Sequence, residues 1–132
     1  MVSLPRRDTD YEKKCLGRVI NIGSMLSLIG MSGRTPYATS KGAILQLTRT
    51  LAIEVARDGI NVNVILPGPF ATDINLPIRD DPETYKAFIS RVPLGRWGEL
   101  HEIGGMALYL ASPASAFVTG AGFSIDGGWV TQ

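Results

Sequence analysis

The chain has 132 residues, of which 45% are hydrophobic, so its length fits one domain around a single core. Thirteen basic residues balance twelve acidic ones, which gives no electrostatic footprint for nucleic acid or an anionic membrane. Cys15 and His101 are each single, so we expect no internal disulfide and no metal site, with His101 at the surface or at a helix cap. No apolar run approaches the roughly 18 residues of a membrane-spanning helix, and the amino terminus does not read as a secretory signal. These features predict a cytoplasmic protein.

The amino-terminal part contains the first predicted strand. Residues 1–16 are polar and charged, and we expect a lead-in segment there, ahead of a domain that covers 17–132. Arg18–Ile22 is β-branched and flanked by two glycines, so it predicts a strand. The glycines, serines and proline of residues 24–36 indicate a loop after that strand.

A long helix and a second strand follow the loop. Apolar residues recur near the helical period from Tyr37 to about Arg57, directly after a proline that suits a helix start. Gly59 predicts the end of this helix, because glycine adopts a positive φ without strain. Ile60–Leu66 alternates β-branched residues with asparagines and predicts the second strand, which a Pro-Gly-Pro sequence ends.

The carboxyl-terminal part contains two more helices and a third strand. Residues 70–80 have the composition of a mobile connection, and a helix over about 81–91 follows, with Asp81 as its cap. A further helix is expected over about 101–111 and a short strand over 123–126. This order of strands and helices predicts an α/β fold with a parallel sheet.

Three polar residues lie where such a fold binds ligands. Ser24 ends the first strand, at the carboxyl edge of the predicted sheet. Tyr37 and Lys41 are four residues apart at the start of a helix, so their side chains share one face. A lysine ammonium beside a phenol lowers a pKa that starts at about 10, and the tyrosine can then exchange a proton with an alcohol or carbonyl oxygen that a serine hydroxyl holds. Each feature alone is usually structural, a helix-surface pair or a turn serine, but the combination favours a catalytic site.

Several spaced motifs together resemble the short-chain dehydrogenase/reductase family. The resemblance covers about residues 17–130 and depends on the order and spacing of the motifs, including thirteen positions from Ser24 to Tyr37. The segments that carry it are Asn21-Ile22-Gly23-Ser24, Tyr37-Ala38-Thr39-Ser40-Lys41, Pro67-Gly68 with Thr72-Asp73, Pro93-Leu94-Gly95-Arg96-Trp97-Gly98-Glu99, Phe117-Val118-Thr119-Gly120 and Asp126-Gly127-Gly128. The pattern is most similar to gluconate and glucose dehydrogenases and to 3-oxoacyl reductases.

The resemblance implies an oxidoreductase that interconverts a secondary alcohol and a ketone with NAD or NADP and needs no metal. By this resemblance, Tyr37 is the general acid/base, Lys41 lowers its pKa and holds the nicotinamide ribose, and Ser24 orients the substrate oxygen. The residues implied at the nicotinamide end of the cofactor are Ile22, Tyr37, Lys41, Pro67, Gly68, the backbone of Phe70 and the hydroxyl of Thr72.

The resemblance also implies a partial fold, namely the last three strands of a doubly wound, Rossmann-type parallel sheet with their helices. No glycine-rich turn for the cofactor pyrophosphate precedes Ser24, so we expect the amino-terminal nucleotide-binding half to be absent and the chain alone to be inactive. The residue that distinguishes NAD from NADP belongs to that half. Val19–Ile22 would then form an open sheet edge, which predicts a homo-oligomer or pairing with a missing amino-terminal half. The alternative is a non-catalytic remnant that serves as an oligomerisation or interaction module.

The substrate class stays open. In the family, the segment that closes over the substrate corresponds to residues 73–96 here. This segment mixes apolar and basic side chains, which are Ile74, Leu76, Ile78, Tyr85, Phe88, Arg79, Lys86 and Arg91. The mixture fits a small polyol or a sugar acid as well as a 3-oxoacyl group.

Overall fold

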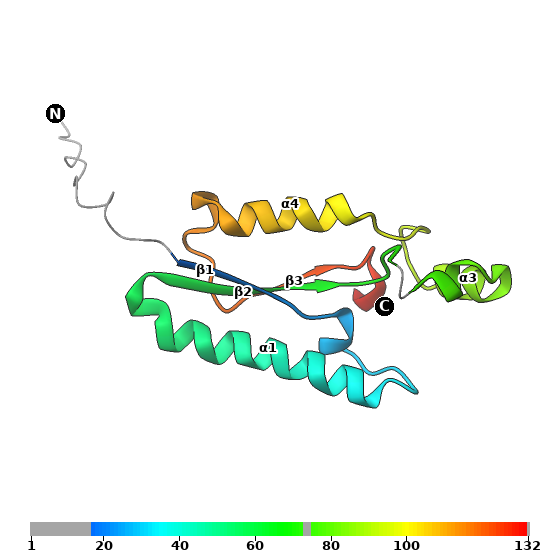
Figure 1. The fold of residues 1–132 in the computed structure, drawn as a ribbon, viewed down its shortest axis with the longest axis horizontal. Helices are drawn as coiled ribbons and strands as arrows, with labels where there is room; N and C mark the ends of the chain where they lie inside the picture. The colour runs from blue at the N-terminus through cyan, green and yellow to red at the C-terminus, as the bar shows by residue number, and fades with distance from the viewer. Residues whose placement is uncertain (1–16, 73–74, 132) are drawn as a thin grey trace.

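The computed structural model describes residues 17–72 and 75–131 (Figure 1). The predicted lead-in segment 1–16 and the residue Ile74 of the predicted substrate segment lie outside the described residues. Within the described parts the chain forms a three-stranded parallel sheet in the order β1-β2-β3. The strands are β1 (Gly17–Ile22), β2 (Ile60–Pro67) and β3 (Gly122–Ile125). The predicted α/β fold with a partial, Rossmann-type parallel sheet is confirmed.

Helices cover both faces of this sheet. Helix α1 (Thr35–Val55) lies along one face and helix α4 (Leu100–Ala111) along the other, whereas α3 (Pro82–Ile89) lies beyond the ends of the strands (Figure 1). The connections from β1 to β2 and from β2 to β3 step across the sheet in the same direction. Because their long helices lie on opposite faces, the two connections have opposite hands, and one of them departs from the usual right-handed rule.

The observed ends of helices α1 and α3 differ from the predicted ends by no more than two residues. Helix α1 begins two residues before Tyr37, with the proline in its first turn, and ends at Val55. A short 3₁₀ turn, Ala56–Asp58, continues it to Gly59, which has the predicted positive φ of 75°. Helix α3 ends at Ile89, two residues before the predicted end at about Arg91. After α3 the chain continues in turns. The backbone N–H groups of residues 90, 91 and 92 donate hydrogen bonds to backbone carbonyls of the helix.

The connection after β2 differs from the prediction in two respects. Part of the segment expected to be a mobile connection forms a short helix, α2 (Leu76–Arg79). Asp81 does precede α3, but its side chain does not cap the backbone N–H groups of that helix. Its carboxylate instead accepts a hydrogen bond from the hydroxyl of Thr84. Local sequence placed the cap correctly, but a neighbouring hydroxyl competes for the capping oxygen.

The central strand β2 provides the core. Val62, Val64, Ile65 and Leu66 are almost completely buried, because the central strand of a parallel sheet is covered on both faces. Leu45 of α1 packs against this strand, and burying each such side chain contributes about 1.5–3 kcal/mol.

A second cluster lies at the carboxyl end of the sheet. It joins Met25 and Leu26, which follow β1, to Val92 and Trp129. This cluster fixes the turn that follows β1 and therefore the position of Ser24.

The strand β1 pairs with β2 on one side, and within the described residues no strand pairs with its other side. Val19 and Ile22 on this strand are 37% and 49% exposed. The predicted open edge is therefore present in the described part of the chain. None of the helices described here is long and apolar enough to cross a membrane.

Candidate active site

Ser24 lies at the carboxyl end of β1, where the chain leaves the sheet. The residue is 6% exposed, and its extended backbone (φ −162°) ends the strand. Its side-chain oxygen accepts a hydrogen bond of 3.1 Å from the backbone N–H of Leu26, which caps the short 3₁₀ turn Met25–Ser27. Among the described residues, no acceptor is bonded to the Ser24 hydroxyl proton. That proton can therefore be donated to an oxygen atom of a bound molecule.

Tyr37 and Lys41 lie in the first turns of α1. The ammonium nitrogen of Lys41 is 5.9 Å from the centroid of the Tyr37 ring and donates a hydrogen bond of 3.0 Å to the carbonyl oxygen of Ile22. Tyr37 is 47% exposed, so it lies at the surface of the described part of the chain.

The loop after β2 contains the other predicted cofactor residues. The backbone N–H of Gly68 donates to the carbonyl of Ile125 at 2.8 Å, and a Cβ on Gly68 would lie 2.5 Å from the Cα of Asp126. A glycine is required here because the two chain segments approach so closely. Pro67 is the last residue of β2, so this contact fixes the direction in which the loop leaves the sheet.

Phe70 and Thr72 lie further along the same loop. Phe70 is 4% exposed and pairs with Gly98 in an isolated bridge. The side-chain amide of Asn75 donates to the carbonyl of Phe70 at 2.9 Å and lies 3.4 Å from the hydroxyl oxygen of Thr72. Asn75 was not identified from the sequence. Its place shortly after a Pro-Gly turn could have indicated a bond to this loop, because asparagine side chains often form hydrogen bonds with nearby backbone groups.

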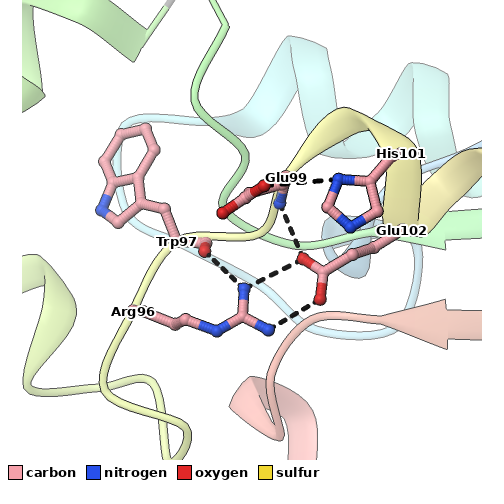
Figure 2. Close-up of polar contacts among 5 residues, drawn as sticks. All are labelled: Arg96, Trp97, Glu99, His101 and Glu102. Carbon is pink, nitrogen blue, oxygen red and sulfur yellow. Dashed lines mark hydrogen bonds and ion pairs between the residues drawn. The ribbon is translucent and has the colours of Figure 1, made fainter.

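A charged cluster holds the start of α4 (Figure 2). Arg96 donates to both carboxylate oxygens of Glu102, at 2.9 and 2.6 Å, and to the carbonyl of Trp97 at 3.0 Å. The same carboxylate accepts from the backbone N–H of Glu99 at 2.7 Å. These hydrogen bonds, first of all that from Arg96, lower the pKa of Glu102 to about 2, and the pairing raises the pKa of Arg96.

His101 belongs to the edge of this cluster. Its Nδ1 lies 3.3 Å from a carboxylate oxygen of Glu99, and its side chain is 76% exposed, in agreement with the expected surface position. Arg96 and Glu102 also line a small cavity together with Phe70. The cluster therefore fixes the segment between α3 and α4 beside the loop that follows β2.

The four groups thus meet at one edge of the sheet: a buried serine, an accessible tyrosine, a lysine that joins α1 to β1, and a tightly packed loop. The chain belongs to the short-chain dehydrogenase/reductase family. The matching family model, described as enoyl-(acyl carrier protein) reductase, covers residues 7–130.

Relatives of known activity are similar over most of this chain. A 2-dehydro-3-deoxy-D-gluconate 5-dehydrogenase from Bacillus subtilis (strain 168) is 43% identical over 91% of this chain and 47% of its own length. A 3-oxoacyl-(acyl carrier protein) reductase from Vibrio harveyi is 40% identical over 88% of this chain and 47% of its own length.

A solved structure, the gluconate 5-dehydrogenase from Burkholderia cenocepacia J2315 in complex with NADP and tartrate, superposes with a TM-score of 0.85. It is 40% identical, and the match covers 88% of this chain and 46% of that one. The chain spans about half the length of the curated relatives it matches.

Proposed function

We propose that this chain carries the proton-transfer site of an NAD- or NADP-dependent oxidoreductase that interconverts a secondary alcohol and a ketone. Membership of the short-chain dehydrogenase/reductase family supports the reaction type. The observation that carries the proposal is the position of Lys41, which donates to the carbonyl of Ile22 and lies 5.9 Å from the Tyr37 ring. This contact assembles the end of β1 and the start of α1 into one site beside Ser24.

Each polar group has one role in the proposed reaction. Tyr37 transfers a proton to the ketone oxygen in reduction and takes it back in oxidation. Lys41 holds its positive charge beside Tyr37, where it stabilises the negative charge that develops on the phenol oxygen as the proton is transferred. The Ser24 hydroxyl donates a hydrogen bond to the same substrate oxygen, which keeps that oxygen in place while charge develops on it.

The chemistry of these donors and acceptors fits the nicotinamide end of a dinucleotide. When bound, the cofactor supplies or accepts the hydride. A lysine ammonium has three N–H donors, and the bond to Ile22 uses one of them, so the remaining donors are available for ribose hydroxyls. We propose that Pro67, Gly68, the backbone of Phe70 and the hydroxyl of Thr72, on the loop after β2, contact the nicotinamide.

Binding of the rest of the cofactor needs groups beyond this site. A dinucleotide pyrophosphate is usually held by the amide groups of a glycine-rich turn at a helix amino terminus. The described residues contain no strand that runs into such a turn before Ser24. We therefore propose that the chain alone binds NAD or NADP weakly and is inactive, and that turnover needs a nucleotide-binding half.

We propose a sugar acid as the substrate class, with a 3-oxoacyl group as the second candidate. The relatives that act on 2-dehydro-3-deoxy-D-gluconate and on gluconate support the first, and the 3-oxoacyl reductase supports the second. The described part of the predicted substrate segment contains both apolar and basic side chains, among them Phe88 and Arg91, so it is compatible with either class.

Cofactor titration is the direct test of this function. Binding of NADH and of NADPH is followed by nicotinamide fluorescence, and reduction of 5-keto-D-gluconate by the absorbance of the reduced cofactor. Tyr37→Phe removes one exposed oxygen, so we expect unchanged cofactor binding and unfolding but at least about a 100-fold loss of any turnover. Where the chain turns over, equal rates for Tyr37→Phe and the unchanged chain would contradict the role of Tyr37. Lack of binding at millimolar cofactor would agree with the proposed need for a nucleotide-binding half, and turnover by the chain alone would contradict that need.

We also propose that the chain forms a homo-oligomer. This proposal holds whether the chain is part of an enzyme or is a non-catalytic oligomerisation module. It is supported by the open edge of β1 and by large apolar side chains that protrude from α1, α4 and the segment before β3. The most exposed of these are Ile53 at 81%, Leu108 at 74% and Phe117, which is fully exposed. Exposed edges and apolar patches favour self-association. Size-exclusion chromatography with light scattering tests this proposal, and a compact, stable monomer would refute it.

A further inference from the structure

Ser27 joins the turn that carries Ser24 to the helix that carries Tyr37 and Lys41. The hydroxyl oxygen of Ser27 accepts a hydrogen bond of 3.2 Å from the backbone N–H of Ser24. The same hydroxyl donates a hydrogen bond of 2.7 Å to the backbone carbonyl of Lys41. One side-chain oxygen therefore connects the main chains of two residues that belong to the proposed site.

The turn itself is internally closed. The N–H of Ser27 donates to the carbonyl of Ser24 at 2.9 Å, and the N–H of Leu26 donates to the Ser24 hydroxyl oxygen at 3.1 Å. Met25 and Leu26 are buried in the cluster that includes Trp129. The turn therefore behaves as one unit, and a bond between this unit and α1 determines where the Ser24 hydroxyl stands relative to the Tyr37–Lys41 face.

In this link the Ser27 hydroxyl uses its one donor and one of its two acceptor positions, as donor to the helix and acceptor from the turn. The neighbouring bond from Lys41 to the carbonyl of Ile22 joins the same two elements through a long, flexible side chain. The Ser27 link is shorter, because it runs from main chain to main chain through a single oxygen. It therefore restricts the relative position of the two elements more strongly.

We propose that Ser27 is a positioning residue, which holds Ser24 and the Tyr37–Lys41 pair in register without contacting the substrate. This inference rests on the proposed function of the site. A reacting group displaced by about 1 Å can lose about 100-fold in rate, so loosening one of two links should cost about tenfold in turnover with little change in substrate binding. A serine that merely stabilised the turn would change the free energy of unfolding and leave the rate of the folded protein unchanged.

The experiment compares Ser27→Ala, which removes the hydroxyl, with Ser27→Thr, which retains it. Ser112→Ala is the matched control, because the Ser112 hydroxyl bonds only to backbone groups two and three residues away, those of Ala114 and Tyr109, and lies outside the predicted substrate segment. Three quantities are measured on the full chain: exchange of the Ser24 amide proton, the rate at which acetic anhydride labels the Lys41 amine, and kcat and KM with NADPH and 5-keto-D-gluconate.

We expect Ser27→Ala to accelerate exchange of the Ser24 amide and to raise the labelling rate of Lys41, each by about fivefold, as for loss of one hydrogen bond. Where the chain turns over, kcat falls about tenfold with KM unchanged. Ser27→Thr restores all of these values, and Ser112→Ala leaves them as they are. Unchanged exchange and labelling in Ser27→Ala, or no restoration by threonine, would overturn the proposal. Lack of turnover in the unsubstituted chain agrees with the proposed need for a nucleotide-binding half, and the exchange and labelling rates then decide the role of Ser27.

Discussion

Lys41 donates a hydrogen bond of 3.0 Å from its ammonium group to the backbone carbonyl of Ile22, and so joins the beginning of α1 to the last residue of β1. A hydrogen bond of 2.9 Å between Asn21 and Thr48 joins the same two elements further along the helix. The contact between Lys41 and Ile22 brings the positive charge to 5.9 Å from the Tyr37 ring. The same bond therefore joins two elements and places a positive charge near Tyr37. Substitution of Lys41 tests the first effect through the free energy of unfolding and the second through turnover.

Lys41→Met should remove the charge while keeping most of the apolar stem. We expect any turnover to fall by about 100-fold or more, because the charge that develops on the Tyr37 oxygen during proton transfer loses the positive charge of Lys41. The free energy of unfolding should change little, since the bond is exposed. Arg49→Met, which removes a charge from an exposed position on the same helix, is the control and should retain turnover. Equal rates for the two variants would rule out this role of Lys41.

Thr48 holds α1 against β1 through its hydroxyl. This oxygen accepts from the side-chain amide of Asn21 at 2.9 Å and donates to the carbonyl of Ile44 at 2.8 Å, and the residue is completely buried. Thr48→Val leaves the amide of Asn21 without its partner, so we expect a loss of about 1–3 kcal/mol in the free energy of unfolding. Thr48→Ser keeps the hydroxyl and loses one methyl group, at about 0.8 kcal/mol. Urea unfolding of both variants measures the difference, and a valine variant as stable as the serine variant would contradict it.

Gly68 and Gly104 should respond in opposite directions to the same substitution. A Cβ on Gly68 would lie 2.5 Å from the backbone of Asp126, so Gly68→Ala should destabilise the fold by about 1–3 kcal/mol and shift β3 against β2. At Gly104, inside α4, nothing lies within 4 Å of an added Cβ. Gly104→Ala should therefore stabilise the chain by about 0.5–1 kcal/mol. Thermal unfolding of the two variants tests the contrast, and a stabilised Gly68→Ala would exclude the close approach.

The Arg96–Glu102 pair should make stability depend on pH in the acid range. The pKa of Glu102 is lowered to about 2 from its ordinary value of 4.5, first by the hydrogen bonds from Arg96. A carboxyl group with a depressed pKa stabilises the fold fully above pH 4.5, and this contribution is lost as the pH falls from there towards 2. The effect should be modest, since both side chains are partly exposed.

Glu102→Gln removes this contribution, so the unchanged chain should be the more stable protein at pH 6, with the difference disappearing near pH 2. Urea unfolding at several pH values measures it. Glu54→Gln, on the exposed side of α1, accounts for the general effect of removing one negative charge. A stability difference between the unchanged chain and Glu102→Gln that stays constant over this range would contradict the lowered pKa of Glu102.

The amino-acid sequence by itself determined the elements and the family. The β-branched runs gave β1 and β2 within one residue at each end, and the positive φ of Gly59 followed from its place after a helical repeat. The spaced motifs around Ser24, Tyr37 and Lys41 identified the family that the comparisons confirm. These features depend on local backbone preference and on fixed spacing along the chain, which a single sequence contains. The roles of the three residues remain predictions.

Only the tertiary structure decided how the elements are joined. The sequence could not show that α1 and α4 lie on opposite faces, that Asn21 bonds to Thr48, or that the Asp81 carboxylate is occupied by Thr84 instead of capping α3. It also could not distinguish Ser27 from other turn serines. Its role depends on the carbonyl of Lys41, which comes within reach only after β1 and α1 have packed against β2. Hydrogen bonds between residues far apart in the sequence depend on where the packing of apolar side chains places each backbone group, and no local pattern encodes that position.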